Sequence, residues 1–182
     1  MYLQIAPHQN RNLRELAQQG PPQDEVLVYV LFVNTTNRTV DLYWVRERET
    51  ENIQYTLKPF EEVRVNTFNT HTWFFRDYYT GERMHVRSQR IFCPVRIRMP
   101  RDPQRPEELC DVRSQVLIHF PLRTLKENCL WLIVKWLKRT CNAPRDYINN
   151  YMIPATLKQQ LLTILATIEV YCSQAQAARI RR

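Results

Sequence analysis

Glycine is scarce in this sequence, with two glycines in 182 residues. A phosphate-binding loop needs several glycines close together so that its backbone N–H groups can approach the phosphate, and we expect no such loop here. The histidines show neither the His-x-His nor the His-x-Asp spacing that metal sites use; they are His8, His71, His85 and His119. We therefore expect no catalytic residue, no cofactor and no bound metal in this chain.

The cysteines form no recognisable framework, because they are odd in number, scattered and without a Cys-x-x-Cys pair. They are Cys93, Cys110, Cys129, Cys141 and Cys172. This pattern predicts neither a disulfide scaffold nor a zinc site, and it is typical of reduced thiols in an intracellular protein. Cys129 lies on an apolar helical stripe, so we expect it to behave as a small buried hydrophobe rather than a nucleophile.

Apolar runs long enough to cross a membrane are also missing. The run at 129–137 has nine residues and contains Lys135, whereas a membrane-spanning helix needs about 20 apolar residues. Residues 1–20 carry charge without the apolar stretch of a signal peptide. We expect no membrane segment, and a location in the cytoplasm and nucleus.

The formal net charge of +8 raises the alternative of a basic scaffold that binds nucleic acid or the cytoskeleton. The basic residues are spread over 76–105 and the tail 179–182, and they are mixed with acidic residues rather than interleaved with aromatic ones. Arg96 and Arg98 alternate as on the solvated face of a strand. A phosphate-binding surface loses affinity steeply with salt, so the salt dependence of binding separates this alternative from a site for a neutral ligand.

Residues 25–121 carry the signals of a β domain, after an arm at 1–24 that ends in a Gly-Pro-Pro break. Valine-rich 26–33 and residues 39–46 predict a hairpin around a turn at 34–37. Further strands are predicted at 53–57, 62–67, 72–77, 83–86, 91–99 and 112–120, with breaks at 58–59, 69–70, 80–81 and the proline-rich 100–106. Short strands at this spacing predict an antiparallel sandwich.

After Pro121 the apolar residues change from a period of two to helical spacing, so we place a domain boundary there. Thr124 and Glu127 have the spacing of a capping box, which predicts a helix from about 124 to 139. Pro144 can open a short second helix, and 155–178 predicts a long third one. The predicted fold class is α+β: an N-terminal antiparallel β-sandwich, 25–121, followed by a small helical domain, 122–182, with a basic C-terminal tail.

The first predicted helix is apolar on two sides. One stripe contains Leu125, Cys129, Leu132 and Trp136, and the other contains Leu130, Val134 and Leu137. A surface helix needs one apolar face only. We therefore expect one stripe to pack inside this chain and the other to bind a partner.

Two blocks of sequence have a distinctive pattern: Thr124-Leu125-Lys126-Glu127 with Cys129-Leu130, and His71-x-Trp73-x-Phe75-Arg76-Asp77. The first is similar to the elongin-binding BC box of the von Hippel-Lindau tumour suppressor family, and the second is similar to the His-x-Trp-x-Phe-Arg-Asp strand of that family. The resemblance extends over residues 26–165. Smaller matches are Asn34, Trp44 and Thr56-Leu57-x-Pro59.

The resemblance implies a substrate-recognition subunit of a ubiquitin ligase, in complex with elongin C, elongin B and a cullin scaffold with its RING subunit. The residues implied in elongin C binding are Thr124, Leu125, Cys129, Leu130 and Leu132. A shorter match implies cullin contacts at Ile153, Pro154, Leu157 and Leu161, although a helix N-terminus alone also explains the proline.

The resemblance also implies a pocket for 4-hydroxyproline in hypoxia-inducible factor α, which the ligase would direct to proteasomal degradation. Trp44, Tyr55 and Trp73 would be aromatic walls, and Thr67 and His71 would bond the hydroxyl group. Thr67 replaces a serine of the family, and Asn66 and Phe68 replace a histidine and a tyrosine that serve the same substrate site. A gapless count from Trp44 puts Gln54 at the tyrosine position; we choose Tyr55 because glutamine cannot form an aromatic wall.

Overall fold

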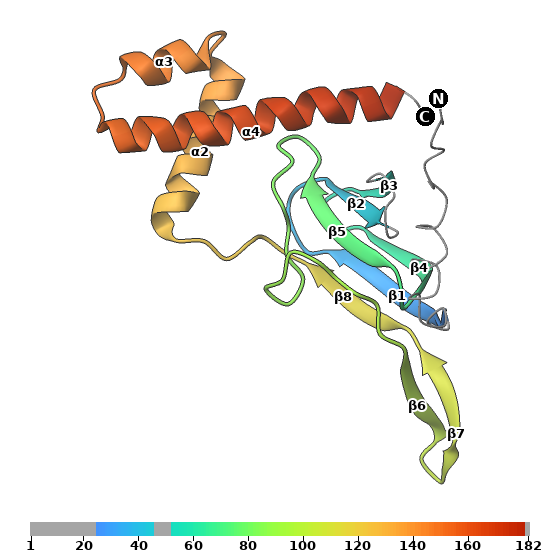
Figure 1. The fold of residues 1–182 in the computed structure, drawn as a ribbon. Helices are drawn as coiled ribbons and strands as arrows, with labels where there is room; N and C mark the ends of the chain where they lie inside the picture. The colour runs from blue at the N-terminus through green and yellow to red at the C-terminus, as the bar shows by residue number, and fades with distance from the viewer. Residues whose placement is uncertain (1–24, 46–51, 181–182) are drawn as a thin grey trace, which may run out of the picture.

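The computed structural model describes residues 25–45 and 52–180, with side chains described as far as residue 175. The arm at 1–24, part of the charged loop at 47–52 and the end of the tail lie outside these residues. The strands are β1 (Leu27–Asn34), β2 (Val40–Val45), β3 (Asn52–Leu57), β4 (Glu62–Phe68), β5 (Thr72–Asp77), β6 (Ile97–Asp102), β7 (Arg105–Val112) and β8 (Ser114–Ile118). The helices are α2 (Leu125–Thr140), α3 (Pro144–Asn150) and α4 (Ala155–Ile180). Strands followed by helices confirm the predicted α+β class (Figure 1).

Two three-stranded sheets form the β-sandwich, in the orders β4-β1-β8 and β3-β2-β5. Residues on β1 alternate between the interior and the outer face, with Val28, Val30 and Phe32 buried, because successive side chains of a strand point to opposite sides. The Phe32 ring lies 5.1 Å from that of Trp73 and 5.4 Å from that of Phe75. Trp73 and Phe75 of β5 thereby pack against the opposite sheet, whereas Phe74 stacks on Tyr43 on the other face.

The prediction that the first two strands form a hairpin is wrong. β1 pairs with β4 and, in parallel, with β8, whereas β2 pairs with β3 and β5. Between them the buried Asn34 donates through Nδ2 to the carbonyls of Arg38 (2.7 Å) and Lys58 (2.8 Å), and its Oδ1 accepts from the Thr36 N–H at 3.0 Å. These bonds make a corner that carries the chain from one sheet to the other. The parallel pair also departs from an all-antiparallel sandwich.

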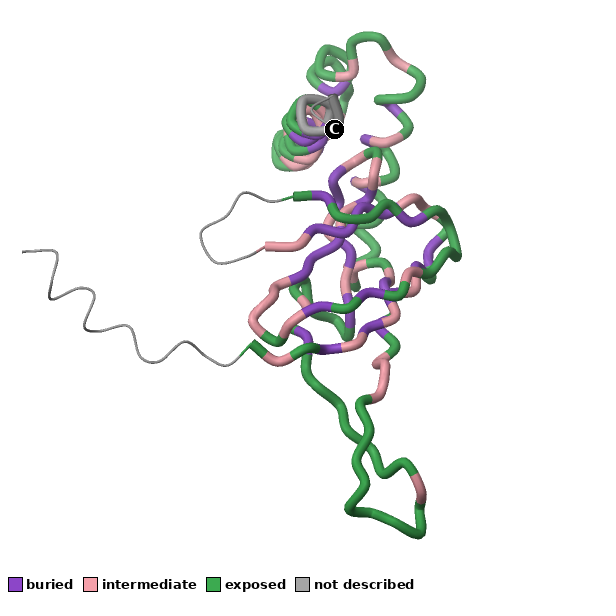
Figure 2. The backbone as a smooth tube through the Cα atoms, turned by 90° about the vertical axis from the view of Figure 1, so that its right-hand side faces the viewer, coloured by how far each residue is buried: buried purple, intermediate pink, exposed green. Residues whose placement is uncertain are grey.

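The region after β5 differs from the prediction in two places. Residues 83–92 make only isolated bridges rather than a strand, one within the segment and three to other parts of the described chain. The proline-rich stretch, predicted as a break, forms the end of a two-stranded ribbon of β6 and β7, with Pro100 opposite Leu109. Proline is tolerated there because each strand of such a ribbon is an edge strand. The ribbon projects from the sandwich, and nearly all of it is exposed (Figures 1 and 2).

The helical domain is built around the inner stripe of α2. The capping box of Thr124 and Glu127 is present in both directions and begins this helix, as predicted. Its buried residues pack with buried side chains of α3 and α4; together they are Leu130, Val134, Leu137, Ile148, Leu161, Leu165 and Ile168. No helix of the described residues is long and apolar enough to cross a membrane.

The far half of α4 extends beyond the helical domain and lies over one end of the sandwich (Figure 1). Its buried Tyr171 donates through its hydroxyl to Asp41 Oδ2 at 3.3 Å, and the Tyr171 hydroxyl oxygen also lies 3.3 Å from the hydroxyl oxygen of Tyr43. The small helical domain therefore gains part of its buried surface from the sandwich, which a helical group of this size needs.

Candidate substrate pocket and partner-binding face

A polar pair stands at the end of the sandwich where β4 turns into β5. Thr67 is 1% exposed, and its Oγ1 accepts from Trp73 Nε1 at 3.0 Å and lies 2.8 Å from His71 Nδ1. The turn that joins these residues is closed by a bond from the His71 N–H to the Phe68 carbonyl, at 3.1 Å. A hydroxyl and an imidazole held together in this way offer a ligand hydroxyl both a donor and an acceptor.

Aromatic rings surround this pair. Trp44 lies opposite Trp73 in the β2–β5 register, and its ring is 4.4 Å from that of His71. Tyr55 lies 6.5 Å from Trp73 with the rings 23° from parallel, and it is 38% exposed. A register shift in the β2–β3 pairing after Leu42 supplies an extra residue, so that Tyr55 faces Leu42. The structure thus brings Trp44, Tyr55, Thr67, His71 and Trp73 together, and it places Tyr55 rather than Gln54 beside Trp73.

The other two predicted pocket residues lie differently. Asn66 follows the opposite face of β4 from Thr67, because neighbouring strand residues alternate, and its Oδ1 accepts from Arg113 Nη2 at 3.1 Å. Phe68 presents its ring to the edge of His71, with centroids 5.2 Å apart. Asn66 is therefore held away from the aromatic cluster, while Phe68 borders it.

Arg113 was missed by sequence reasoning. Besides Asn66, it donates to the carbonyls of Val30 (2.9 Å) on β1 and Val65 (3.1 Å) on β4, and so it ties the start of β8 to the other two strands of its sheet. Nothing distinguishes this arginine in a chain with 26 lysine and arginine residues. Among the described residues, no three His, Cys, Asp or Glu side chains are grouped as metal ligands.

The outer stripe of α2 forms a second candidate site, an apolar face without cover among the described residues. Leu125 is 80% exposed, Leu132 is 68% exposed and Trp136 is 55% exposed. Cys129 is exposed beside them, so the expectation that it is buried is wrong for this chain by itself. Sequence reasoning missed two neighbours, Leu122 at 78% and Ile133 at 42% exposed, because they fall outside the stripe. We call these six residues the α2 face.

Two predicted contact residues of α2 do not belong to this face. Leu130 is 7% exposed and packs in the helical core. Thr124 serves as the N-cap: its backbone N–H and hydroxyl both donate to Glu127 Oε2 at 2.9 Å, and these bonds lower the pKa of the Glu127 carboxyl. Thr124 therefore fixes where the α2 face begins.

The residues predicted to bind the cullin also include both exposed and buried side chains. Pro154 is exposed, Ile153 and Leu157 are half-buried against the helical core, and Leu161 is 4% exposed inside it. Large exposed side chains precede the proline; they are Tyr147, Tyr151 and Met152, the last 98% exposed. The surface at this end of the helical domain is thus made by Pro154 and the residues before it.

A polar pair among aromatic rings on the sandwich and an exposed apolar face on the helical domain are thus the two candidate binding sites of the described chain. Comparison with known proteins identifies the family. Residues 23–99 match the family model described as VHL beta domain. The chain is also 64% identical over 182 residues to Protein Vhl of Drosophila melanogaster, with 100% of both chains covered. The chain belongs to the VHL family, and this membership supports a VHL-type substrate receptor.

Proposed function

We propose that this chain is the substrate-recognition subunit of an elongin–cullin–RING ubiquitin ligase, and that it selects prolyl-hydroxylated hypoxia-inducible factor α for degradation. The observation that carries the proposal is the contact of Thr67 Oγ1 with His71 Nδ1, at 2.8 Å, among aromatic rings. 4-Hydroxyproline fits this arrangement, because it combines a compact apolar ring with one hydroxyl group.

The aromatic rings and the Thr67–His71 pair would recognise different parts of the hydroxyproline. The pyrrolidine ring packs against the exposed Tyr55 and its neighbour Trp73, since flat aromatic surfaces bury such a ring well. Its hydroxyl is placed at Thr67 and His71, where one bond is donated and one accepted. Trp73 holds the Thr67 oxygen in position through its own N–H. Proline without the hydroxyl gains the packing but not the two hydrogen bonds.

The α2 face is assigned to elongin C, which brings elongin B with it. Leu125 and Cys129 enter the partner's pocket, and Leu132 packs beside them. The cullin scaffold with its RING subunit is assigned to Pro154 and the exposed residues that precede it. This chain then contributes no chemistry of its own; it holds the substrate near the enzyme that transfers ubiquitin, and such positioning accelerates a reaction by raising the effective concentration of the reactants.

The decisive experiment is a titration of the chain, in complex with elongins B and C, with two hypoxia-inducible factor peptides that differ only in proline or 4-hydroxyproline. Two hydrogen bonds at about 1–1.5 kcal/mol each predict a preference of about 30- to 150-fold for the hydroxylated peptide. The preference is expected to be insensitive to salt and to be lost in His71→Ala.

Equal binding of the two peptides would overturn the assignment of the pocket and leave the elongin assignment to stand by itself. Binding that falls steeply as salt rises would instead favour the basic scaffold, because release of counterions from phosphate produces that dependence.

A further inference from the structure

The turn that follows β5 joins the sandwich to both long helices. Asp77 fixes this turn: its Oδ1 accepts from the backbone N–H groups of Tyr79 (3.0 Å) and Thr80 (2.7 Å). Its backbone N–H donates to the Glu82 carbonyl, and its own carbonyl accepts from the Gly81 N–H, both at 2.9 Å. Residues 77–82 therefore form a hydrogen-bonded turn at the edge of the sandwich, and we call it the 77–82 turn.

Gly81 gives this turn its contact with α4. A Cβ atom at this position would lie 2.2 Å from Cγ of Tyr171, and the backbone φ of +68° is also one that side chains disfavour. The Tyr171 ring therefore rests directly on the glycine. Its hydroxyl donates to Asp41 of β2, so the ring is held at both ends.

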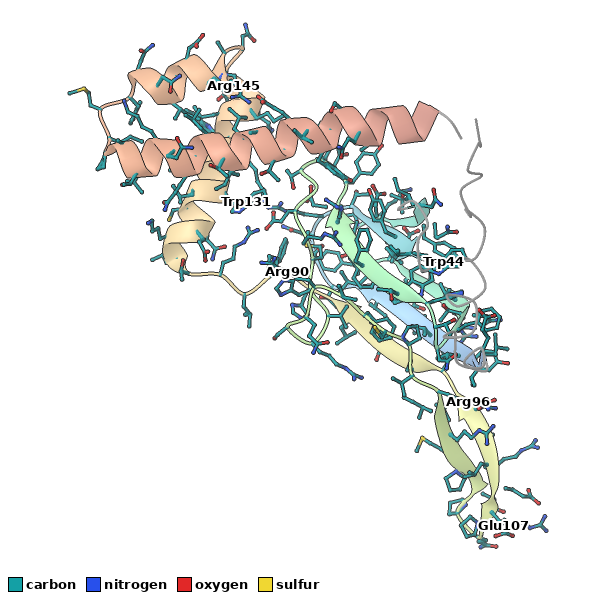
Figure 3. All side chains as sticks on the ribbon, viewed as in Figure 1. Trp44, Arg90, Arg96, Glu107, Trp131 and Arg145 are labelled. Carbon is teal, nitrogen blue, oxygen red and sulfur yellow. The ribbon has the colours of Figure 1, made fainter. Side chains whose placement is uncertain are left out.

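Glu82 gives the same turn its contact with α2. The carboxylate is 5% exposed and accepts from three cations on three different segments. They are Arg38 in the corner after β1 (3.3 Å), Arg123 in the linker (2.6 Å) and Lys135 on α2 (2.7 Å). Arg123 and Lys135 also lie over the Trp131 ring, which α2 directs toward the sandwich (Figure 3).

This cluster has more positive than negative charge, so it depends on Glu82. Arg38 has a second partner in Asp77 Oδ2, at 3.2 Å, whereas Arg123 and Lys135 have Glu82 as their ion-pair partner among the described residues. Burial lowers the pKa of Lys135 despite its bond to Glu82, because desolvation disfavours the charged amine. Without the carboxylate, Arg123 and Lys135 would lose their ion-pair partner in a poorly solvated interface, and Asp77 alone would face the three cations.

We propose that the 77–82 turn is the joint that sets the orientation of the α2 face relative to the Thr67–His71 pocket, with Glu82 as its positioning residue. The turn is rigid in itself, it touches α4 through Gly81 and α2 through Glu82, and it continues directly from β5, which carries Trp73. The consequence for ubiquitin transfer rests on the proposed function, since it requires that a substrate in the pocket be modified by an enzyme recruited through the α2 face.

The orientation is tested by single-molecule fluorescence energy transfer on the chain in complex with elongins B and C. Dyes are introduced through unnatural amino acids at Gln115 on the sandwich and Asp146 on α3, both exposed. We expect one narrow distance distribution for the wild type and for Glu62→Gln, an exposed control with the same chemical change. Glu82→Gln is expected to broaden or displace it, and an unchanged distribution in Glu82→Gln would overturn the proposal.

The second arm follows ubiquitin transfer to peptide substrates that carry hydroxyproline and one lysine at varied spacing. Glu82→Gln is expected to bind peptide and elongin C within about 2-fold of wild type, yet to modify the preferred lysine about 10-fold more slowly and with a weaker spacing preference. An unchanged rate and preference would contradict a positioning role. If the wild type modified no lysine while Glu82→Gln still broadened the distance distribution, the proposed function would fail and the joint would stand.

A folding failure is separated by the double variant Glu82→Gln/Lys135→Met. It removes a cation together with the carboxylate and fills the space with a side chain of similar length, so it is expected to fold better than Glu82→Gln alone. It still lacks the ionic contact between α2 and the turn. A double variant with the wild-type distance distribution would show that Glu82 does not set the orientation.

Discussion

The pocket and the α2 face differ in how complete they are in the free chain. In the pocket, the Thr67 hydroxyl already contacts both His71 and Trp73, and the rings around it are packed on one another. On the α2 face, side chains such as Leu125 and Trp136 lie exposed on a helix whose opposite side is well packed. The side chains of the pocket are therefore already in contact with one another in the free chain, whereas those of the α2 face are exposed and uncovered.

Because of this difference, we expect the two sites to contribute differently to binding. A preformed pocket loses little conformational entropy on binding, so a small change in the ligand, one hydroxyl, is read out directly. The α2 face contributes affinity instead, because each large apolar side chain that a partner covers stabilises the complex by about 1.5–3 kcal/mol. Under the proposed function, the pocket would provide selectivity and the α2 face would provide affinity for the partner.

The largest effect is expected from a charge on the α2 face. Leu125→Asp or Leu132→Asp should reduce elongin C affinity at least about 100-fold, since a buried carboxylate without a partner opposes binding. The unfolding midpoint of the sandwich should not change, because neither side chain touches it. Isothermal titration with purified elongin C measures the affinity, and Lys126→Asp on the same helix is the exposed control. Full-strength binding by both variants would remove the assignment of this face.

Thr67→Val tests the pocket, because it keeps the shape of the side chain and deletes its hydroxyl. His71 and Trp73 lose their shared partner, so the preference for hydroxyproline should fall by about 10- to 100-fold. Thr67→Ser keeps the hydroxyl and should retain most of the preference. Peptide titrations of the elongin-bound complex measure both variants. A Val variant that still prefers hydroxyproline would mean that His71 reads the hydroxyl by itself.

The two tryptophans test whether the internal bonds of the pocket matter for stability. Trp73→Phe breaks the bond to Thr67 and should cost about 1–3 kcal/mol of unfolding free energy. Trp44→Phe should cost less, because the buried Trp44 N–H has no hydrogen-bond partner among the described residues. Urea titrations followed by circular dichroism compare them. Equal losses would show that ring packing, rather than the hydrogen bond, holds the pocket together.

The smallest expected effect concerns a histidine outside both sites. The buried His85 Nδ1 has no partner in the described chain, and burial, with Arg90, His119 and Arg123 nearby, lowers the pKa of His85 below 6.5. The unfolded chain then binds the proton more tightly, so stability should fall as the pH drops from about 6.5 through the lower folded-state pKa. His85→Gln should lessen this dependence in urea midpoints at pH 7.5 and 5.5; an identical dependence would contradict it.

Local signals in the sequence predicted the helical domain well. The capping box and the two stripes of α2 depend on residues three or four apart, and the structure places Leu130 and Leu125 on separate stripes as their spacing indicated, with only Leu130 buried. Strand pairing was less accessible. Asn34 begins an ordinary turn pattern, yet its buried bonds to the distant Lys58 direct the chain into the other sheet.

In the candidate sites, too, local features could be predicted and distant ones could not. His71 and Trp73 are two residues apart in the chain, so their common face was predictable. The position of Tyr55 on β3 beside Trp73 depended on a register shift that has no signature in the sequence. Glu82 was not predictable at all. Its three cations come from positions 38, 123 and 135, and only the folded chain brings them together.

The parallel pair of β1 and β8 has a consequence for synthesis. β1 ends at Asn34 and its partner begins at Ser114, so the first strand emerges from the ribosome long before the strand that completes its sheet. Contacts between such distant segments form slowly because a long loop must close first. The sandwich cannot be finished until nearly all of it has been translated, and the helical domain, encoded last, is added to a β domain that has only just closed.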